Sequence, residues 1–213
     1  MRSKIIFTLF AVAILNIGPL LFKSDLILHF KTIILSIAAA ILWLSQPGFS
    51  ASEMQINKQK DKLSVLIILF CSSLSVFSAV SEWAYVTENK SEINIVTIIG
   101  LLMLVAGITI RVVSINILGK HFTATVNIDE KHELIQKGPY KFVRHPGYSG
   151  AFIAIIGCPL FLNNLYTVFV ATAAMGIAYY IRINLEEEAL SGHFGDAYKA
   201  YQKRTHRLVP FIW

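Results

Sequence analysis

The chain of 213 residues is 55% hydrophobic and only 15% charged, whereas soluble globular domains carry about 25% charged residues. This composition excludes an ordinary soluble domain and indicates a protein that lies mostly in lipid. The formal net charge of +6 does not indicate a nucleic-acid partner, because the Lys and Arg residues flank apolar segments instead of forming one basic domain.

Successive apolar runs predict the helices, and several of them are near the length of about 20 residues that crosses a bilayer core. The runs are Ile5–Phe22, Leu26–Leu44, Leu63–Val80, Ile93–Leu118, Tyr148–Leu162 and Leu165–Ile183. Only Asn163 and Asn164 separate the last two runs, which predicts a tight helical hairpin. We therefore predict an all-α fold, a polytopic transmembrane bundle of about five to six membrane helices with a C-terminal helical hairpin.

The positions of the basic residues predict the orientation in the membrane. With a cytosolic N-terminus, most of the 19 Lys and Arg residues lie on the cytosolic side, and only Lys23 and Lys90 fall in loops on the other side. Cytosolic loops carry such an excess of positive charge. We expect Lys31, near the outer end of the second run, to snorkel outward. The first run, which follows Arg2 and Lys4, should remain as a helix and not be cleaved as a signal peptide.

Chemically capable side chains are concentrated in the second half of the chain. We interpret residues 1–92 as a scaffold of transmembrane helices and residues 93–213 as the catalytic core. Arg111 lies inside the fourth apolar run, where an ionisable group requires a partner or a water-filled cavity unless it snorkels to the headgroups. The six His and two Cys residues show no metal-ligand spacing, so we expect no metal centre.

Residues 138–150 (GPYKFVRHPGYSG) predict a turn that leads into a helix. Pro146 suits the first turn of a helix and biases His145 out of the helical conformation. Arg144 and His145 therefore lie at a helix entrance, where free N–H groups and partial positive charge attract a carboxylate or phosphate. A membrane re-entry turn with Arg144 on a lipid phosphate is the alternative interpretation.

A second polar cluster, Arg182 with Glu186 and Glu187, follows the last apolar run. Arg182 and Glu186 are four residues apart, so a surface ion pair worth about 0.3 kcal/mol is the simplest interpretation. The predicted hairpin, however, returns Glu186 to the side of Arg144 and Tyr148. A helix entrance, an arginine and carboxylates in one pocket suit a small zwitterion with an additional positive charge.

Three segments carry an ordered pattern of residues. They are Leu118-Gly119 with Phe122, then Gly138–Gly150, then Arg182, Glu186, Glu187, Leu190, Phe194, Gly195, Tyr198 and Tyr201 followed by Arg207, Leu208 and Pro210. This pattern resembles the isoprenylcysteine carboxyl methyltransferase family, within a wider superfamily that includes phospholipid N-methyltransferases. The resemblance covers about residues 100–213 and is to a prokaryotic-type member. Thr123–Asn127 carries no obvious family signature.

The resemblance implies S-adenosylmethionine as the methyl donor, bound in a pocket that faces the cytosol. The cofactor contacts that it implies are Tyr140, Arg144, His145, Tyr148, Glu186, Glu187 and, as a weaker member, His121. The catalytic residues that we expect are Arg182, Glu186 and Arg111. The two arginines would orient an acceptor carboxylate.

The expected acceptor is a lipophilic or lipidated molecule that enters from the bilayer, with an isoprenylcysteine-like carboxylate as the leading candidate. We expect an integral protein of a prokaryotic inner membrane, in contact with membrane lipids. One alternative is a sterol-reductase-like, NADPH-dependent membrane oxidoreductase, which shares the Arg-His-Pro-x-Tyr pattern. Another is a lipid-binding membrane protein without turnover. The choice among O-, N- and S-methylation and the oligomeric state stay open at this point.

Overall fold

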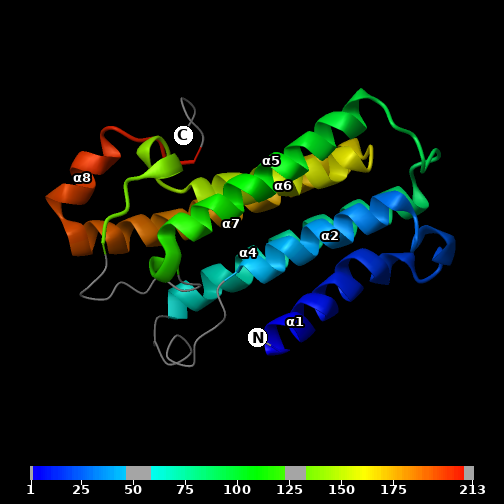
Figure 1. The fold of residues 1–213 in the computed structure, drawn as a ribbon, viewed down its shortest axis with the longest axis horizontal. Helices are drawn as coiled ribbons and strands as arrows, with labels where there is room; N and C mark the ends of the chain where they lie inside the picture. Colours follow the sequence, from blue (N-terminus) through cyan, green and yellow to red (C-terminus); the bar gives the residue numbers. More distant parts are fainter. Residues whose placement is uncertain (1, 47–58, 123–132, 209–213) are drawn as a thin grey trace.

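The structure, a computed structural model, describes residues 2–46, 59–122 and 133–208. Seven α-helices make up most of these residues. They are α1 (Arg2–Val12), α2 (Phe30–Ser45), α4 (Gln59–Tyr85), α5 (Ile95–Leu118), α6 (Pro146–Phe161), α7 (Leu165–Phe194) and α8 (Asp196–Gln202). The first six lie along the length of the molecule, and α8 lies at one end (Figure 1). The prediction of an all-α bundle is confirmed.

Several helix boundaries differ from the apolar runs, and the differences at α2 and α7 have local reasons or consequences. Helix α2 begins at Phe30 and not at Leu26, because a 3-10 turn precedes it and the His29 ring caps it by accepting from the backbone N–H of Lys31 (3.3 Å). Helix α7 continues to Phe194, well past the predicted apolar run. The acidic cluster therefore lies within a helix, where it does not oppose the dipole of a helix end.

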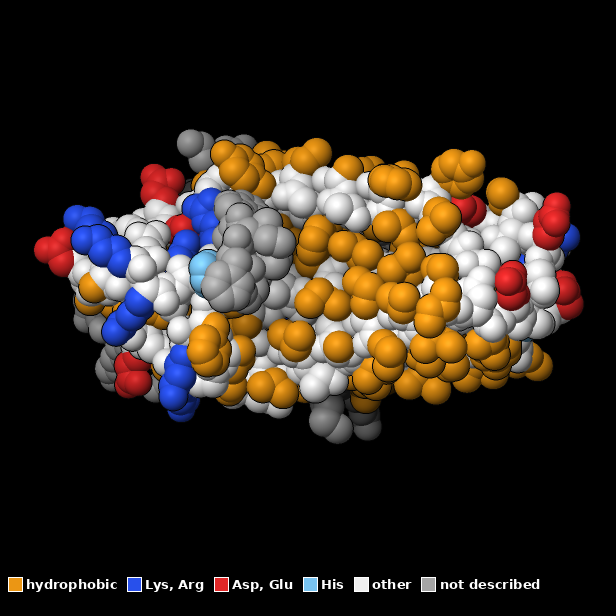
Figure 2. All heavy atoms as spheres, turned by 90° about the horizontal axis from the view of Figure 1, so that it is seen from above, with side chains coloured by type: hydrophobic (Ala, Val, Ile, Leu, Met, Phe, Trp, Pro, Cys, Tyr) orange, Lys and Arg blue, Asp and Glu red, His pale blue; other side chains and the backbone are white. Residues whose placement is uncertain are grey.

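Three of the described helices are long and apolar enough to cross a membrane: α4 over Asp61–Tyr85, α5 and α7. The segments Lys4–Leu20, Phe30–Ser45 and Pro146–Phe161 are shorter apolar helices. Figure 2 shows hydrophobic side chains over the middle of the molecule and Lys and Arg residues gathered toward the end that carries α8. Such an uncovered apolar surface is what a bundle presents to lipid.

Helices α5 and α6 approach each other closely because glycines form their contact. A Cβ atom added at Gly107 would lie 2.5 Å from backbone atoms of Gly150 and Ala154, and one added at Gly157 would lie 2.7 Å from the backbone nitrogen of Leu104. Small residues at this spacing allow membrane helices to pack backbone against backbone. Helices α5 and α6 are therefore packed backbone against backbone.

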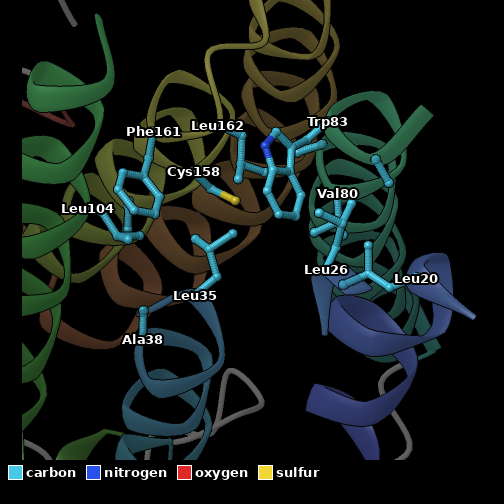
Figure 3. Close-up of a cluster of buried hydrophobic side chains, with 13 residues drawn as sticks. Leu20, Leu26, Leu35, Ala38, Val80, Trp83, Leu104, Cys158, Phe161 and Leu162 are labelled. Carbon is cyan, nitrogen blue, oxygen red and sulfur yellow. The ribbon is translucent and has the colours of Figure 1, made fainter. Parts of the chain in front are cut away.

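A cluster of buried apolar side chains joins this pair of helices to the N-terminal helices (Figure 3). Its labelled members are Leu20, Leu26, Leu35, Ala38, Val80, Trp83, Leu104, Cys158, Phe161 and Leu162. They come from α2, α4, α5, α6 and the turns beside them, so residues far apart in the sequence share one core.

The expectation that Lys31 snorkels outward is wrong. Its side chain is fully buried, donates to the backbone oxygen of Glu92 (3.0 Å), and lies over the ring of Phe161 at 5.9 Å from the ring centre. The ammonium group finds an acceptor inside the bundle because the loop before α5 folds over the start of α2.

Side-chain hydrogen bonds also tie α4 to α7 at this end of the bundle. The Asn164 amide donates to the backbone oxygen of Ala79 (2.7 Å). The carboxylate of Glu82 accepts from the backbone N–H of Thr167 (3.0 Å) and from its hydroxyl. Glu82 thus caps the first turn of α7, where a carboxylate is stabilising.

The glycine contact yields a first prediction. Gly107→Ala should lower the melting temperature of the detergent-solubilised protein by about 5 °C, because the new methyl group forces α5 and α6 apart at a cost of about 1–3 kcal/mol. Gly176→Ala on α7 is the matched control, since a Cβ atom there meets nothing within 4 Å. Thermal unfolding followed by circular dichroism measures both variants, and equal melting temperatures would contradict the proposed contact.

Candidate functional site

The structure has the predicted helix entrance, and residues 206–208 are hydrogen-bonded beside it. Pro146 opens α6, with His145 in the capping position. The backbone N–H of Arg144 donates to the oxygen of His206 (2.8 Å), and that of His145 donates to the oxygen of Arg207 (3.2 Å). The segment after α8 therefore lies beside the residues that lead into α6, although some sixty positions separate them in the chain.

Glu187 is the centre of an ion-pair cluster at this entrance. Its Oε1 accepts from Arg144 Nε (2.7 Å) and lies 3.2 Å from His145 Nε2, and its Oε2 accepts from Arg207 Nη2 (2.7 Å) and Nε (3.0 Å). The Glu187 side chain is only 7% exposed. Such charge-assisted bonds around a buried carboxylate hold all the partners in place. Glu187 is therefore occupied by cations of the chain itself.

Glu186, the neighbouring carboxylate, is in a different state. Its Oε2 is buried without a hydrogen-bond partner among the described residues, and the nearest ring nitrogen, His145 Nδ1, is 3.9 Å away. The buried hydroxyl of Tyr198 on α8 also lacks a partner in the described part of the chain. Burying polar atoms without partners costs free energy. Two such atoms beside one entrance indicate a place for a polar ligand.

Tyr140 supports the wall of the entrance. Its hydroxyl donates to the backbone oxygen of Ser114 on α5 (3.3 Å), and its own backbone oxygen accepts from the hydroxyl of Tyr201 (2.6 Å). Burial raises the pKa of Tyr201 to about 12, so its hydroxyl keeps the proton that it donates. Tyr140 thereby connects α5, the turn before α6, and α8.

Arg182 on α7 lies in a buried polar contact with the first turn of α4. Its Nη1 pairs with the carboxylate of Asp61 and donates to the hydroxyl of Ser64 (3.0 Å). Its Nε donates to the hydroxyl of Tyr148 on α6 (3.1 Å). One guanidinium group therefore joins α4, α6 and α7.

Arg111 on α5 is 9% exposed and does not snorkel. Its Nη2 donates to the side-chain oxygen of Gln46 at the end of α2 (2.8 Å), and its guanidinium lies over the rings of Phe122 (5.2 Å) and Tyr148 (5.8 Å). Among the described residues it forms no ion pair. Arg111 is thus a buried cation whose partners are neutral.

Arg111 also lines an apolar cavity of about 190 Å³. Side chains of α1, α2, α4, α5, α6 and α7 line it, with Arg111 and Gln46 among the few polar ones. Asn16, another lining residue, has a buried amide without a hydrogen-bond partner among the described residues. A mostly apolar cavity with a few placed polar groups is the usual form of a small-molecule site.

The structure brings most of the predicted site residues together. Tyr148 contacts both predicted arginines, and His145 joins Tyr148 to the carboxylate cluster through rings 5.8 Å apart. His121, half-buried at the end of the 3-10 turn Gly119–His121, follows α5 directly, and its role stays a prediction. Thr123–Asn127 lies outside the described residues.

Sequence reasoning missed four contributors: Gln46, Asp61, Tyr198 and Arg207. Gln46 and Asp61 lie at the ends of apolar helices in the N-terminal half, where a polar residue is ordinary. Tyr198 and Arg207 belong to the ordered family pattern, but the sequence assigned neither of them a role. Asp61 lies between Lys60 and Lys62 just before an apolar run, so no local pattern distinguished it from an ordinary charged residue at a helix start.

Comparisons with known proteins identify the family of the chain. A family model described as "Isoprenylcysteine carboxyl methyltransferase (ICMT) family" matches residues 98–192, which include α6 and most of α5 and α7. A probable protein-S-isoprenylcysteine O-methyltransferase of Oryza sativa subsp. indica is 34% identical over 165 residues, covering 76% of this chain and 82% of the relative. The protein-S-isoprenylcysteine O-methyltransferase of Tribolium castaneum is 32% identical over 143 residues, covering 63% of this chain and 51% of the relative.

A solved structure shares the fold. The eukaryotic intramembrane Ras methyltransferase ICMT superposes with a TM-score of 0.59 at 23% identity, over 94% of this chain and 74% of that chain. The likeness extends to the N-terminal helices, beyond the segment that the family model matches. The chain therefore belongs to the isoprenylcysteine carboxyl methyltransferase family, a family of integral membrane enzymes that take the methyl group from S-adenosylmethionine.

Proposed function

We propose that the chain methylates the carboxylate of an isoprenylcysteine-like acceptor, with the donor at the charged entrance and the lipid tail in the apolar cavity. The observation that carries the proposal is the place of Arg111. Arg111 lines the apolar cavity and lies over the ring of Tyr148, and its partners are neutral. A buried cation of this kind attracts a carboxylate that arrives on a lipid chain.

The entrance fits S-adenosylmethionine by the chemistry of its unpaired groups. We assign the carboxylate of Glu186 to a positive charge of the donor, because Glu187 is occupied by Arg144 and Arg207. Burial raises the pKa of Tyr198, as do the nearby carboxylates, so its hydroxyl keeps its proton and would donate to an oxygen of the donor. In this assignment Arg144, His145 and Glu187 shape the pocket more than they contact the donor.

The residues of the chain then have separate tasks in the reaction. When bound, S-adenosylmethionine supplies a methyl group on a positively charged sulfur. Arg111 would orient the acceptor carboxylate, which is already ionised near neutral pH and needs no base. The apolar cavity would strip water from that carboxylate, and the fixed geometry of Tyr148 and Arg182 would align it. Alignment, more than proton transfer, is the task of this site.

The charge distribution supports a cytosolic site. In Figure 2, Lys and Arg residues gather at the end of the molecule that carries α8, while the opposite end shows mostly Asp and Glu. An excess of positive charge marks the cytosolic side, so we place the entrance and the N-terminus there. Five to six crossings stay a prediction, since three of the helices in the described part of the chain are long enough to span a membrane. The relatives reported above are eukaryotic, and a prokaryotic origin also stays a prediction.

The relatives' names support the acceptor class, since they specify O-methylation of protein S-isoprenylcysteine. Entry from the bilayer is consistent with a cavity that apolar helices line on several sides. The reductase alternative has weaker support, because family membership favours methyl transfer. Measured turnover of an isoprenylcysteine analogue would exclude a protein that only binds lipid.

The second prediction concerns the donor. Glu186→Gln should weaken binding of S-adenosylhomocysteine, which keeps the ammonium group of the donor, by about tenfold or more, because a charge-assisted contact is worth about 1.5–3 kcal/mol. Isothermal titration calorimetry on the detergent-purified protein measures this affinity. The matched control is Glu188→Gln, which removes an exposed carboxylate two positions along the same helix.

Glu188→Gln should bind like the wild type. Equal affinities for both variants would show that Glu186 does not contact the donor. NADPH is titrated in parallel, and binding of NADPH alone would reject methyl transfer in favour of the reductase alternative.

The third prediction concerns the acceptor. Arg111→Gln should lower kcat/KM for N-acetyl-S-farnesylcysteine by about 100-fold, because the carboxylate loses its buried cationic partner at a cost of about 3 kcal/mol. Affinity for S-adenosylhomocysteine should stay within about twofold. Arg204→Gln, which removes an exposed arginine at the same end, is the control and should keep full turnover. A parallel loss of donor affinity in Arg111→Gln would place Arg111 in the donor pocket instead.

A further inference from the structure

We infer that Asp61, at the start of α4, is a positioning residue for the methyl transfer, acting through Arg182. The inference rests on the proposed function and names a participant from outside the segment that the family model matches. Asp61 belongs to the half of the chain that the sequence presents as scaffold. The structure places it against a residue of the site.

The contact is buried on all sides. Asp61 is 6% exposed, Ser64 1% and Arg182 3%. Arg182 reaches Asp61 and Ser64 through Nη1 and the hydroxyl of Tyr148 through Nε. The guanidinium is planar and rigid, so the side that Asp61 holds fixes the direction of the side that meets Tyr148.

Asp61 also separates the tasks of the two buried arginines. Both Arg111 and Arg182 lie near Tyr148, and either could attract an acceptor carboxylate. Asp61 pairs directly with Arg182, whereas Arg111 donates to the neutral amide of Gln46. The acceptor carboxylate therefore has one favoured cation. Without Asp61, Arg182 becomes a competing cation that holds the acceptor out of line with the donor.

A merely structural role for Asp61 would be to fasten α4 to α7. The protein contains a natural control for this, because Glu82 joins the same two helices at the opposite end, through Thr167. Glu82 lies near the other end of α4, far along the helix from the site. Losing either carboxylate weakens the α4–α7 contact, but only the loss of Asp61 changes Arg182.

The test compares Asp61→Asn, Glu82→Gln, Arg182→Gln and the double variant Asp61→Asn/Arg182→Gln. Each full-length protein is purified in detergent and assayed with S-adenosylmethionine and N-acetyl-S-farnesylcysteine. Melting temperatures are measured alongside. We expect Asp61→Asn to lower kcat by about tenfold or more, with the KM for the acceptor unchanged or lower because the released Arg182 binds the carboxylate unproductively.

Two comparisons decide the inference. First, Glu82→Gln should keep kcat within about twofold of the wild type, although its melting temperature falls about as much as that of Asp61→Asn. Second, the double variant should be no slower than Arg182→Gln alone, since both changes act through the Arg182 guanidinium. Equal losses of kcat in Asp61→Asn and Glu82→Gln, or additive losses in the double variant, would overturn it. If the wild type is active and Asp61→Asn keeps full kcat, the inference about Asp61 is wrong and the proposed function still stands. A wild type without turnover would overturn the proposed function as well.

Discussion

The close packing of α5 against α6 is the constraint on which the rest of the site depends. Gly150 brings the two backbones together, because a Cβ atom there would lie 2.6 Å from the backbone nitrogen of Arg111. Gly147, in the first turn of α6, leaves room for the Arg111 guanidinium, whose Nη1 would lie 3.2 Å from an added Cβ atom. The buried cation and the helix entrance are thus two parts of one contact. Larger residues at either glycine would separate them.

Near that contact, one of two adjacent carboxylates is paired with cations of the chain and the other is not. Glu187 is bound by Arg144, His145 and Arg207, and this closed cluster fastens the C-terminal segment over the entrance. Glu186, one residue away, points to a different environment because successive helical residues are rotated by about 100°. Adjacent carboxylates therefore serve different purposes, one in holding the pocket together and one, as we propose, in binding the donor.

The site also has a polar side and an apolar side. Its polar side is built from the turn before α6, the end of α7, and α8, while its apolar side is a cavity between membrane helices. Tyr148 lies at the boundary, with its hydroxyl bonded to Arg182 and its ring beside Arg111. In the proposed function, the charged donor reaches the site from the polar side and the lipophilic acceptor reaches it from the apolar side.

The sequence by itself determined the helical class, the helix entrance at Pro146 and the ordered pattern of the family, because hydropathy, proline chemistry and motif spacing are local properties. It also indicated that the hairpin brings Glu186 near Arg144. Only the tertiary structure decided which charges are paired. Asp61 and Arg182 lie on helices that no local pattern relates, and the burial of Lys31 depends on a loop that folds over it. Partners of buried charges are set by long-range packing, which composition and spacing do not encode.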